Sequence, residues 1–470
     1  MRSITIIAAA VALVSVSAAV AMADADKPLL TFGVVSDPHI GAKAEAPMFL
    51  ENALRRLAAR NVDAVLCPGD IAHSGLISEM EEFADVWNRV FPDGRGPDGG
   101  KVELLLVTGN HDIDAWPGRW DGFSEEELRK KRFYHGNNPE KTWRRLFGQK
   151  WEPVWRHEIK GFTFLGVQWR TVGSTVETFV AEAATALDSG KPFFYVQHPH
   201  PKETCHGTYS NGDDFGEAKR ALTPFPNAVA VSGHSHCAIS DERTVWQGSF
   251  TSIGAGCTQD HGLPILQYDN ASAPWHRSWK EKTMAPLSNK ANGRDAGGCF
   301  EYVEVFADHI VVHRLSVTFD EPIGPAWVIP IPAREGGPLD FSRRAAEGTP
   351  PQFPADAILS VEFCPMGHPL EGAGHRGEPC IAVTFPCAEN VGGHRVFDYE
   401  IRAQSDDGGM VVRRIMSPGF AFPENHANLP GTCLFLPSEL PVGQLIRFIA
   451  IPRDCFGCEG RALFCDWTMK

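Results

Sequence analysis

Five short apolar runs in this chain each end at a side chain that can bind a metal ion. The runs and the residues after them are LLTFGVV before Ser36-Asp37-Pro38-His39, VDAVLCP before Gly69-Asp70, KVELLLV before Thr108-Gly109-Asn110-His111-Asp112, KPFFYV before Gln197-His198, and NAVAV before Ser232-Gly233-His234-Ser235-His236. Short, β-branched and aromatic runs are typical of buried strands. Helical patterns lie between several of them, which predicts a largely parallel sheet. Strand ends in such a sheet converge at one edge, so these distant residues should meet there.

The converging side chains are carboxylates, imidazoles and one amide. Carboxylates and neutral imidazoles bind divalent first-row metals, and an amide oxygen adds a neutral ligand. Two metals about 3.5–4 Å apart can share a bridging carboxylate and a bridging hydroxide. Such a hydroxide is a nucleophile at neutral pH, and both cations stabilise in-line phosphoryl transfer. The residue types therefore predict a two-metal site for phosphoester chemistry.

The ordered set D-x-H, G-D, G-N-H-D, H and G-H-x-H resembles that of the calcineurin-like metallophosphoesterase family. Each motif alone is more often a turn or a structural histidine, whereas all five in this order are specific. The resemblance covers residues 30 to about 330. It implies an α/β fold, a two-sheet sandwich flanked by helices, and a centre of two divalent or mixed-valence transition metal ions (iron, manganese or zinc).

The resemblance also implies a role for each matching residue. One metal would be bound by Asp37, His39 and His236, the other by Asn110, His198 and His234, with Asp70 as the bridge. The family's catalytic histidine corresponds to His111, which would protonate or stabilise the leaving oxygen. Asp112 would orient His111.

The second motif continues as Gly69-Asp70-Ile71-Ala72-His73-Ser74-Gly75, with Glu79 after it. This resembles the cyclic-nucleotide phosphodiesterase-like branch, which usually has an acid where His73 stands. Purple acid phosphatases have a tyrosine ligand at that place, so an iron–tyrosinate site is not expected. Diester substrates are favoured slightly, and monoesters remain open. Loop histidines near ligands contact substrate about as often as they are structural, so substrate contacts are assigned provisionally to His73, His200 and His206.

Residues 1–23 have a basic start, an apolar middle and an Ala-Met-Ala end, which predicts a cleaved signal peptide and a secreted or periplasmic protein. An uncleaved anchor is the rival interpretation. No other run is long enough to span a membrane, so the mature chain is expected to lack a transmembrane segment. Net charge is −14 without a sustained basic tract, so general nucleic-acid binding is not expected.

The remaining chain divides into a catalytic domain over residues 27–332, a linker over 333–355 rich in Gly and Pro, and short alternating strands over 356–470. The strand spacing predicts a small all-β sandwich. Its segment 445–463 resembles the end of a fibronectin type III domain. Such a module is a candidate for surface or glycan contact, although a packing or spacer role is more common.

Twelve cysteines in an exported protein favour disulfides. The pair Cys455 and Cys458 is expected to be a disulfide staple rather than a zinc or redox motif. The leading hypothesis is an exported phosphoesterase acting on a small phosphate ester. The alternative is a non-catalytic binding protein on the same scaffold, acting through its β-sandwich domain.

Overall fold

The computed structural model describes residues 27–114, 123–134, 139–171, 174–187, 190–205, 214–259, 290–291, 294–295, 297–368, 377–390 and 394–469. The predicted signal peptide, His206 and most of the polar segment 262–297 lie outside these ranges. Within them, no helix combines the length and the apolar character needed to cross a bilayer.

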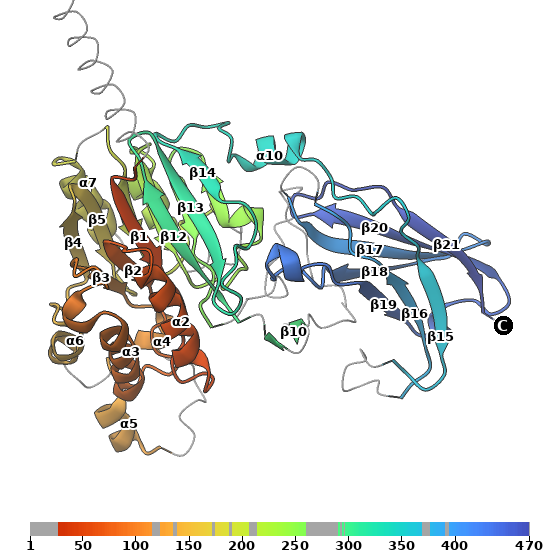
Figure 1. Cartoon of the computed structure of the whole chain (residues 1–470), viewed down its shortest axis with the longest axis horizontal. Helices are drawn as coiled ribbons and strands as arrows, with labels where there is room; N and C mark the ends of the chain where they lie inside the picture. Colours follow the sequence, from red (N-terminus) through yellow and green to blue (C-terminus); the bar gives the residue numbers. More distant parts are fainter. Residues whose placement is uncertain are drawn as a thin grey trace, which may run out of the picture.

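Two six-stranded sheets form the larger domain (Figure 1). The first, in the order β14-β13-β12-β1-β2-β3, contains β1 (Leu30–Val34), β2 (Ala64–Pro68), β3 (Glu103–Val107), β12 (Cys299–Val305), β13 (His309–Ser316) and β14 (Trp327–Pro330). The second, in the order β4-β5-β6-β7-β9-β8, contains β4 (Val154–Ile159), β5 (Phe162–Val167), β6 (Phe193–Val196), β7 (Ala228–Ser232), β8 (Val245–Gln247) and β9 (Thr251–Gly254). Strands β1, β2 and β3 are parallel, as are β5, β6, β7 and β9. The predicted two-sheet fold is confirmed.

Strand β2 shows how the sequence builds the layers. Its residues alternate between the two faces of the sheet because the strand period is two. Leu66 packs into the core between the sheets, whereas Val65 and Cys67 pack under the helices. Across the inter-sheet core, the ring of Phe32 contacts those of Phe164 and Phe194 edge-on, at 5.6 and 4.9 Å between centroids.

Helices cover the outer faces of both sheets (Figure 1). The helices are α2 (Ala46–Ala58), α3 (Ile77–Val90), α4 (Asn110–Ile113), α5 (Glu125–Lys131), α6 (Pro139–Phe147), α7 (Ser174–Ala184) and α9 (Glu217–Leu222). Phe49, Leu50, Ala53, Leu54 and Leu57 of α2 are buried under the first sheet. Helix α5 begins with a capping box: Ser124 Oγ accepts the Glu127 N–H, and Glu127 Oε2 accepts the Ser124 N–H.

The C-terminal region is all-β, as predicted, and is reached through helix α10 (Phe341–Glu347). Its sheets β15-β16-β19 and β18-β17-β20-β21 consist of β15 (Ser360–Cys364), β16 (Cys380–Phe385), β17 (Val396–Ser405), β18 (Met410–Met416), β19 (Gly431–Phe435), β20 (Leu445–Asp454) and β21 (Leu463–Thr468). The paired strands in both sheets are antiparallel and enclose one apolar core. The fibronectin type III resemblance stays a prediction.

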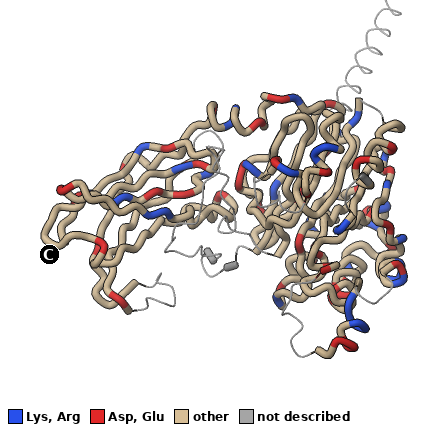
Figure 2. The backbone as a smooth tube through the Cα atoms, turned by 180° about the vertical axis from the view of Figure 1, so that it is seen from behind, with Lys and Arg blue, Asp and Glu red and all other residues tan. Residues whose placement is uncertain are grey.

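Short elements complete the described chain. They are the strands β10 (Lys290–Ala291) and β11 (Arg294–Asp295) and the 3-10 turns η1 (Pro92–Gly94), η2 (Glu242–Thr244), η4 (Glu424–His426) and η5 (Pro437–Glu439). Acidic and basic residues are interspersed over both domains (Figure 2).

The predicted disulfides are not seen: all twelve cysteines lie in the described ranges and each carries a thiol. Packing explains several of them. The thiol of Cys205 is buried and donates to the carbonyls of Thr244 and Ser252 at 3.1 and 3.2 Å. Cys455 is buried in an apolar cluster, while the Cys458 thiol donates to the carbonyl of Ala345 in α10 at 3.4 Å. The expected staple between these last two is therefore absent here.

The two domains share a buried interface around η2. Apolar side chains from both domains and from α10 form one cluster, Ala238, Phe341, Phe397, Met416, Phe420, Cys455 and Phe456. Beside it, Glu242 accepts from Arg314 Nη1 at 2.7 Å, Arg344 Nη2 at 2.5 Å and Trp327 Nε1 at 2.8 Å. We call these four residues the Glu242 network.

Candidate metal centre

The predicted ligand residues all lie just after the ends of five strands. Asp37 and His39 follow β1, Asp70 follows β2, and Asn110 begins α4 directly after β3. On the second sheet, His198 follows β6, and the loop after β7 carries His234 and His236. The carboxyl ends of parallel strands meet at one edge of each sheet, which brings these loops together.

The first group of ligands is Asp37, His39, Asp70 and His236, each with one donor atom within 4.8 Å of the others. The Nε2 atoms of His39 and His236 are 2.9 Å apart. His236 Nε2 lies 3.2 Å from Asp37 Oδ1, and His39 Nε2 lies 3.6 Å from Asp70 Oδ2. Two carboxylates and two imidazoles suit a divalent transition metal.

The second group is Asp70, His198 and His234. His198 Nε2 lies 3.2 Å from Asp70 Oδ2 and 3.1 Å from His234 Nδ1. The predicted amide ligand is also in place, because Asn110 Oδ1 is 3.1 Å from His198 Nε2. Asp70 belongs to both groups through Oδ2, which is the geometry that a bridging carboxylate requires.

Neighbouring groups fix the orientation of the ligands. His198 Nδ1 lies 2.7 Å from the carbonyl of Pro68, so Nδ1–H donates there and Nε2 is directed to the site. Asp37 Oδ2 accepts from Ser36 Oγ at 2.5 Å and from the His234 N–H at 3.1 Å. Such supporting bonds set the tautomer and direction of metal ligands.

The backbone is left-handed at five of the seven ligand positions. The φ angles are 51° at Asp37, 42° at His39, 51° at Asp70, 67° at His234 and 52° at His236. Non-glycine residues seldom adopt this conformation, which costs on the order of 1–3 kcal/mol each. Clustering of this strain at one place is typical of a functional site.

Two motif glycines leave room for the ligands. A Cβ at Gly109 would lie 2.1 Å from Asp70 Oδ1 and 2.7 Å from His198 Nε2. A Cβ at Gly233 would lie 2.2 Å from Asp37 Oδ2. All three distances are too short for a Cβ atom, so glycine is required at both positions.

Charge and burial set the protonation of the ligands. Burial lowers the pKa of His39 to about 3, which keeps this imidazole in the neutral form that binds metals. Burial also acts to lower the pKa of His198, but Asp70 and Asp37 raise it to about 9. Burial acts to raise the pKa of Asp70, yet His198 and His39 hold it well below its usual range. Metal binding would therefore displace a proton from His198.

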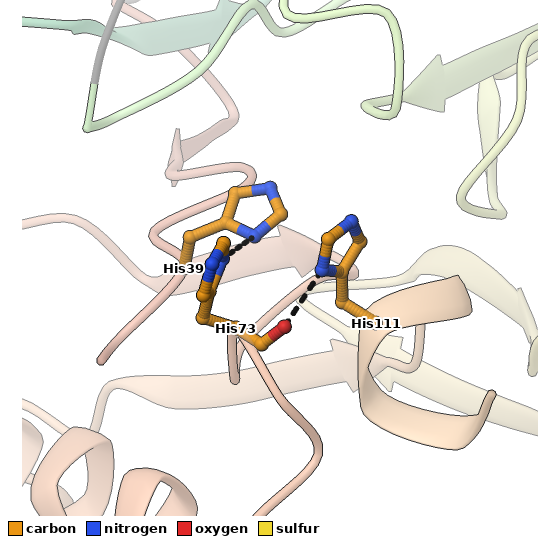
Figure 3. Close-up of side chains that lie close together, drawn as sticks. All are labelled: His39, His73 and His111. Atoms are coloured by element: carbon orange, nitrogen blue, oxygen red, sulfur yellow. Dashed lines mark hydrogen bonds between the residues drawn. The ribbon is translucent and has the colours of Figure 1, made fainter. Parts of the chain in front are cut away.

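His39, His73 and His111 lie beside one another at the edge of the first group (Figure 3). His111 Nδ1 is 2.7 Å from the carbonyl of His73, and His73 Nδ1 is 3.4 Å from His39 Nδ1. The backbone N–H of His111 donates to Asp70 Oδ1 at 2.8 Å. The His73 carbonyl thus orients His111, and Nε2 is the atom through which His111 would act on a substrate.

Asp112 has other partners than the one we expected. Its carboxylate accepts the N–H groups of Ala72 and Gly109, both at 2.8 Å. It therefore fastens the loop after β2 to the start of α4. The interpretation of Asp112 as the residue that orients the His111 ring is corrected by these contacts, since the His73 carbonyl does so.

The other predicted substrate residues differ in their position. His73 lies next to the first group of ligands, as described above. His200 is fully buried, and its Nε2 is 2.8 Å from Ser235 Oγ, in the loop between His234 and His236. This contact indicates that His200 supports the loop that carries His234 and His236. His206 lies outside the described residues.

Trp169, which follows β5, is a further residue at the site that the strand-end motifs do not include. Its indole Nε1 donates to Asp114 Oδ2 at 2.7 Å. Its ring centroid lies 5.8 Å from those of His198 and His234. The rule that strand ends converge applies to β5 as well and would have placed Trp169 at the site.

Comparison with known proteins agrees with this geometry. Residues 30–238 match the sequence model of the calcineurin-like phosphoesterase family, a range that begins at the first residue of β1 and includes all seven ligands. These residues are therefore similar to a calcineurin-like phosphoesterase domain. The match supports metal-dependent hydrolysis of phosphoesters. No curated protein matches the chain.

The chain also matches solved structures at low sequence identity, and three of them follow. A dimetal phosphatase from Danio rerio is 11% identical, with 65% of this chain and 99% of that chain covered and a TM-score of 0.35. A purple acid phosphatase from yellow lupin (Lupinus luteus) seeds is 15% identical, with 65% and 54% covered and a TM-score of 0.38. A predicted phosphoesterase from Streptococcus pneumoniae is 13% identical, with 64% and 97% covered and a TM-score of 0.28. The domain assignment depends on the family match and the ligand set.

Proposed function

We propose that this chain is an exported binuclear-metal phosphoesterase that hydrolyses phosphodiester or phosphomonoester bonds. The observation that carries the proposal is the position of Asp70 Oδ2, which lies 3.6 Å from His39 Nε2 in one ligand group and 3.2 Å from His198 Nε2 in the other. A carboxylate oxygen shared by two donor sets suits two cations rather than one. Iron, manganese and zinc all fit the donor set of carboxylates, imidazoles and an amide oxygen.

When bound, two such cations supply an activated water and neutralise charge on the phosphoryl group. The chain supplies the rest. His39 is held neutral by burial, and Asp37 and Asp70 are held ionised, so the donors are ready for cations. His111, oriented by the carbonyl of His73, would donate a proton or hydrogen bond to the leaving oxygen.

The segment that suggested a diesterase has a structural explanation in this chain. Glu79 Oε2 accepts the N–H groups of Ser74 and Leu76 at 2.9 and 3.1 Å, which shapes the loop that carries His73. Gly75 has a left-handed φ of 65° in the same loop. These residues position the His73 carbonyl and leave the choice between diester and monoester to experiment.

Export is part of the proposal because residues 1–23 read as a cleaved signal peptide. N-terminal sequencing of the protein secreted by its native host, or by a bacterial host into the periplasm, would locate the cleavage site. A mature protein that begins near residue 24 supports export. An intact N-terminus on protein anchored to membranes would favour the rival anchor.

The experiment that tests the proposal combines metal analysis with a substrate screen. The purified chain, reconstituted with manganese, zinc or iron, should retain about two metals after gel filtration. It should hydrolyse mono- or diester phosphates in at least one of these forms. Fewer than about one tightly bound metal per chain, with no turnover, would favour the alternative of a binding protein that acts through its β-sandwich.

A further inference from the structure

A cleft that is partly open to solvent adjoins the metal centre on the side of the second ligand group. Its wall includes the ligand His198 itself, together with Trp169, Val176, Pro199 and Phe215. A phosphoester held at the metal centre would therefore have one substituent directed into this cleft. The inference that follows concerns that substituent and depends on the proposed function.

Trp169 is the fixed wall between the cleft and the metal ligands. Its indole N–H is bound by Asp114, and its backbone N–H lies 3.3 Å from Thr108 Oγ. The ring contacts the imidazoles of His198 and His234, at 5.8 Å between centroids. An aromatic face held so close to two ligands can stack on a flat group attached to the phosphorus atom.

The polar side chains in the wall are already engaged by the protein. Gln168 Oε1 accepts from the N–H and the hydroxyl of Thr108 at 2.7 and 3.0 Å. Gln197 Nε2 donates to the carbonyl of Pro199 at 2.9 Å. Recognition in this cleft would therefore depend on shape and stacking more than on hydrogen bonds to these amides.

The charge of the cleft excludes a second anionic group. Asp114, Asp214 and Glu217 line it, and Arg170, the one cation among the described residues of the wall, forms an ion pair with Asp114. The net charge of these side chains is negative, so they would repel a further phosphate or carboxylate on the substituent. An uncharged substituent meets no such cost.

Phe215 adds a second aromatic surface at the rim. Its side chain is 66% exposed, and its backbone φ is 51°. A bulky residue in the left-handed region is a backbone outlier, and strain of this kind is retained where it serves a site. An exposed phenyl ring on the wall of a cleft is available to contact a ligand.

We propose that this cleft binds the uncharged aromatic substituent of a phosphoester, an aryl or nucleoside group, by stacking on Trp169. The substrate class would then be esters with a single phosphate whose alcohol part is flat. Phosphoesters of small aliphatic alcohols, or of alcohols with further acidic groups, would bind less tightly.

The test compares two ligands that differ only in the aromatic ring. Phenylphosphonate and methylphosphonate both present a phosphonate to the metals and cannot be hydrolysed at the P–C bond. Titration calorimetry with the metal-loaded full chain should show phenylphosphonate binding about tenfold more tightly, as expected for one aromatic stack. A ring with an added carboxylate, 4-carboxyphenylphosphonate, should lose most of this advantage.

Variants then assign the preference to the cleft. In Trp169→Leu chains that still hold two metals, the affinity for phenylphosphonate should be only about one to two times that for methylphosphonate. Phe215→Ala should also reduce the ratio of the two affinities. If Trp169→Leu does not fold, Phe215→Ala alone tests the subsite. The matched control is Trp467→Leu in β21 of the other domain, which should keep the wild-type ratio.

Two outcomes would overturn the aromatic subsite, and a third would overturn the proposed phosphoesterase function. Equal affinity for both phosphonates in the wild type would reject the aromatic subsite. A ratio that is unchanged in both Trp169→Leu and Phe215→Ala would reject it too. If neither phosphonate binds to a chain that holds two metals, the proposed function itself is rejected, and the subsite with it.

Discussion

His39 Nε2 lies 2.9 Å from His236 Nε2, although the two residues are 197 positions apart in the sequence. Two imidazole nitrogens meet at this distance only if at least one of them is neutral, and burial lowers the pKa of His39 to about 3. The pair is accompanied by Asp37 and Asp70, whose pKa values lie below their usual range. Converging donors of this kind are stabilised when a cation is placed between them.

Replacing Asp70 by Asn should remove at least one metal. The substitution takes a negative charge from the oxygen that belongs to both ligand groups. We expect activity to fall by several orders of magnitude, because both metals generate the nucleophile. Metal analysis after dialysis and turnover of an aryl phosphate measure the effect, with Asp85→Asn on the exposed face of α3 as the control. Retention of both metals and of turnover would exclude Asp70 as the bridge.

His111→Ala should separate metal binding from proton donation. We expect metal content to be unchanged and the rate on esters of poor leaving groups to fall by ~10²–10⁴. An activated aryl ester needs little protonation of its leaving group and should lose much less. Equal losses of rate on both esters would indicate that His111 is a positioning residue. Loss of bound metal would indicate that it is a ligand. His157→Ala on β4, distant from the ligand loops in sequence, is the matched control.

Glu242→Ala should destabilise the chain by about 3–5 kcal/mol. The substitution leaves Arg314 and Arg344, which are 1% and 7% exposed, buried without their carboxylate. The free energy of unfolding, measured in urea, gives the effect. Glu335→Ala, at an exposed position of the linker, should change stability by less than about 0.5 kcal/mol. A loss of similar size in both variants would refute the role of the Glu242 network.

Glu301 should make stability depend on pH. Burial raises the pKa of this carboxyl from 4.5 to about 8, and neither oxygen has a hydrogen-bond partner in the structure. Between these two values the native state binds more protons than the unfolded state, so the free energy of unfolding falls as pH rises. Glu301→Gln removes the titration. The free energy of unfolding of Glu301→Gln minus that of the wild type should therefore rise by on the order of 3 kcal/mol between about pH 5 and pH 8.

Denaturant unfolding of both chains at several pH values measures this difference. Glu362→Gln, at an exposed position of β15, is the control and should show no comparable trend. A difference between wild type and Glu301→Gln that stays constant with pH would contradict a buried, protonated carboxyl.

The ligand set could be predicted because each ligand directly follows a local pattern. A strand of five residues can be recognised from its own side chains, and its end is a fixed place in a parallel sheet. Asp112 shows the limit. It is adjacent to His111 in sequence, but consecutive residues of a helix point in different directions, so Asp112 turns back to Gly109 while His111 faces His73. Adjacency in sequence was the wrong guide to contact.

Other features depend on packing between distant segments, which no local pattern shows. The partners of Glu242 come from β13, β14 and α10, and no local pattern in the sequence links them to one another. The cysteines were interpreted from the expected compartment, whereas their thiols are accommodated by carbonyl groups and apolar neighbours. Such contacts become visible only when the chain is folded.

The shared interface bears on how the chain comes apart. The loop that carries His236 continues into Ala238 and Arg243, and the Arg243 guanidinium lies 4.7 Å from the ring centroid of Phe397 in β17. Separating the domains would expose this apolar cluster and remove the Phe397 ring from the Arg243 guanidinium. We therefore expect calorimetry to show a single cooperative melting transition for the whole chain, although the sequence divides into two modules.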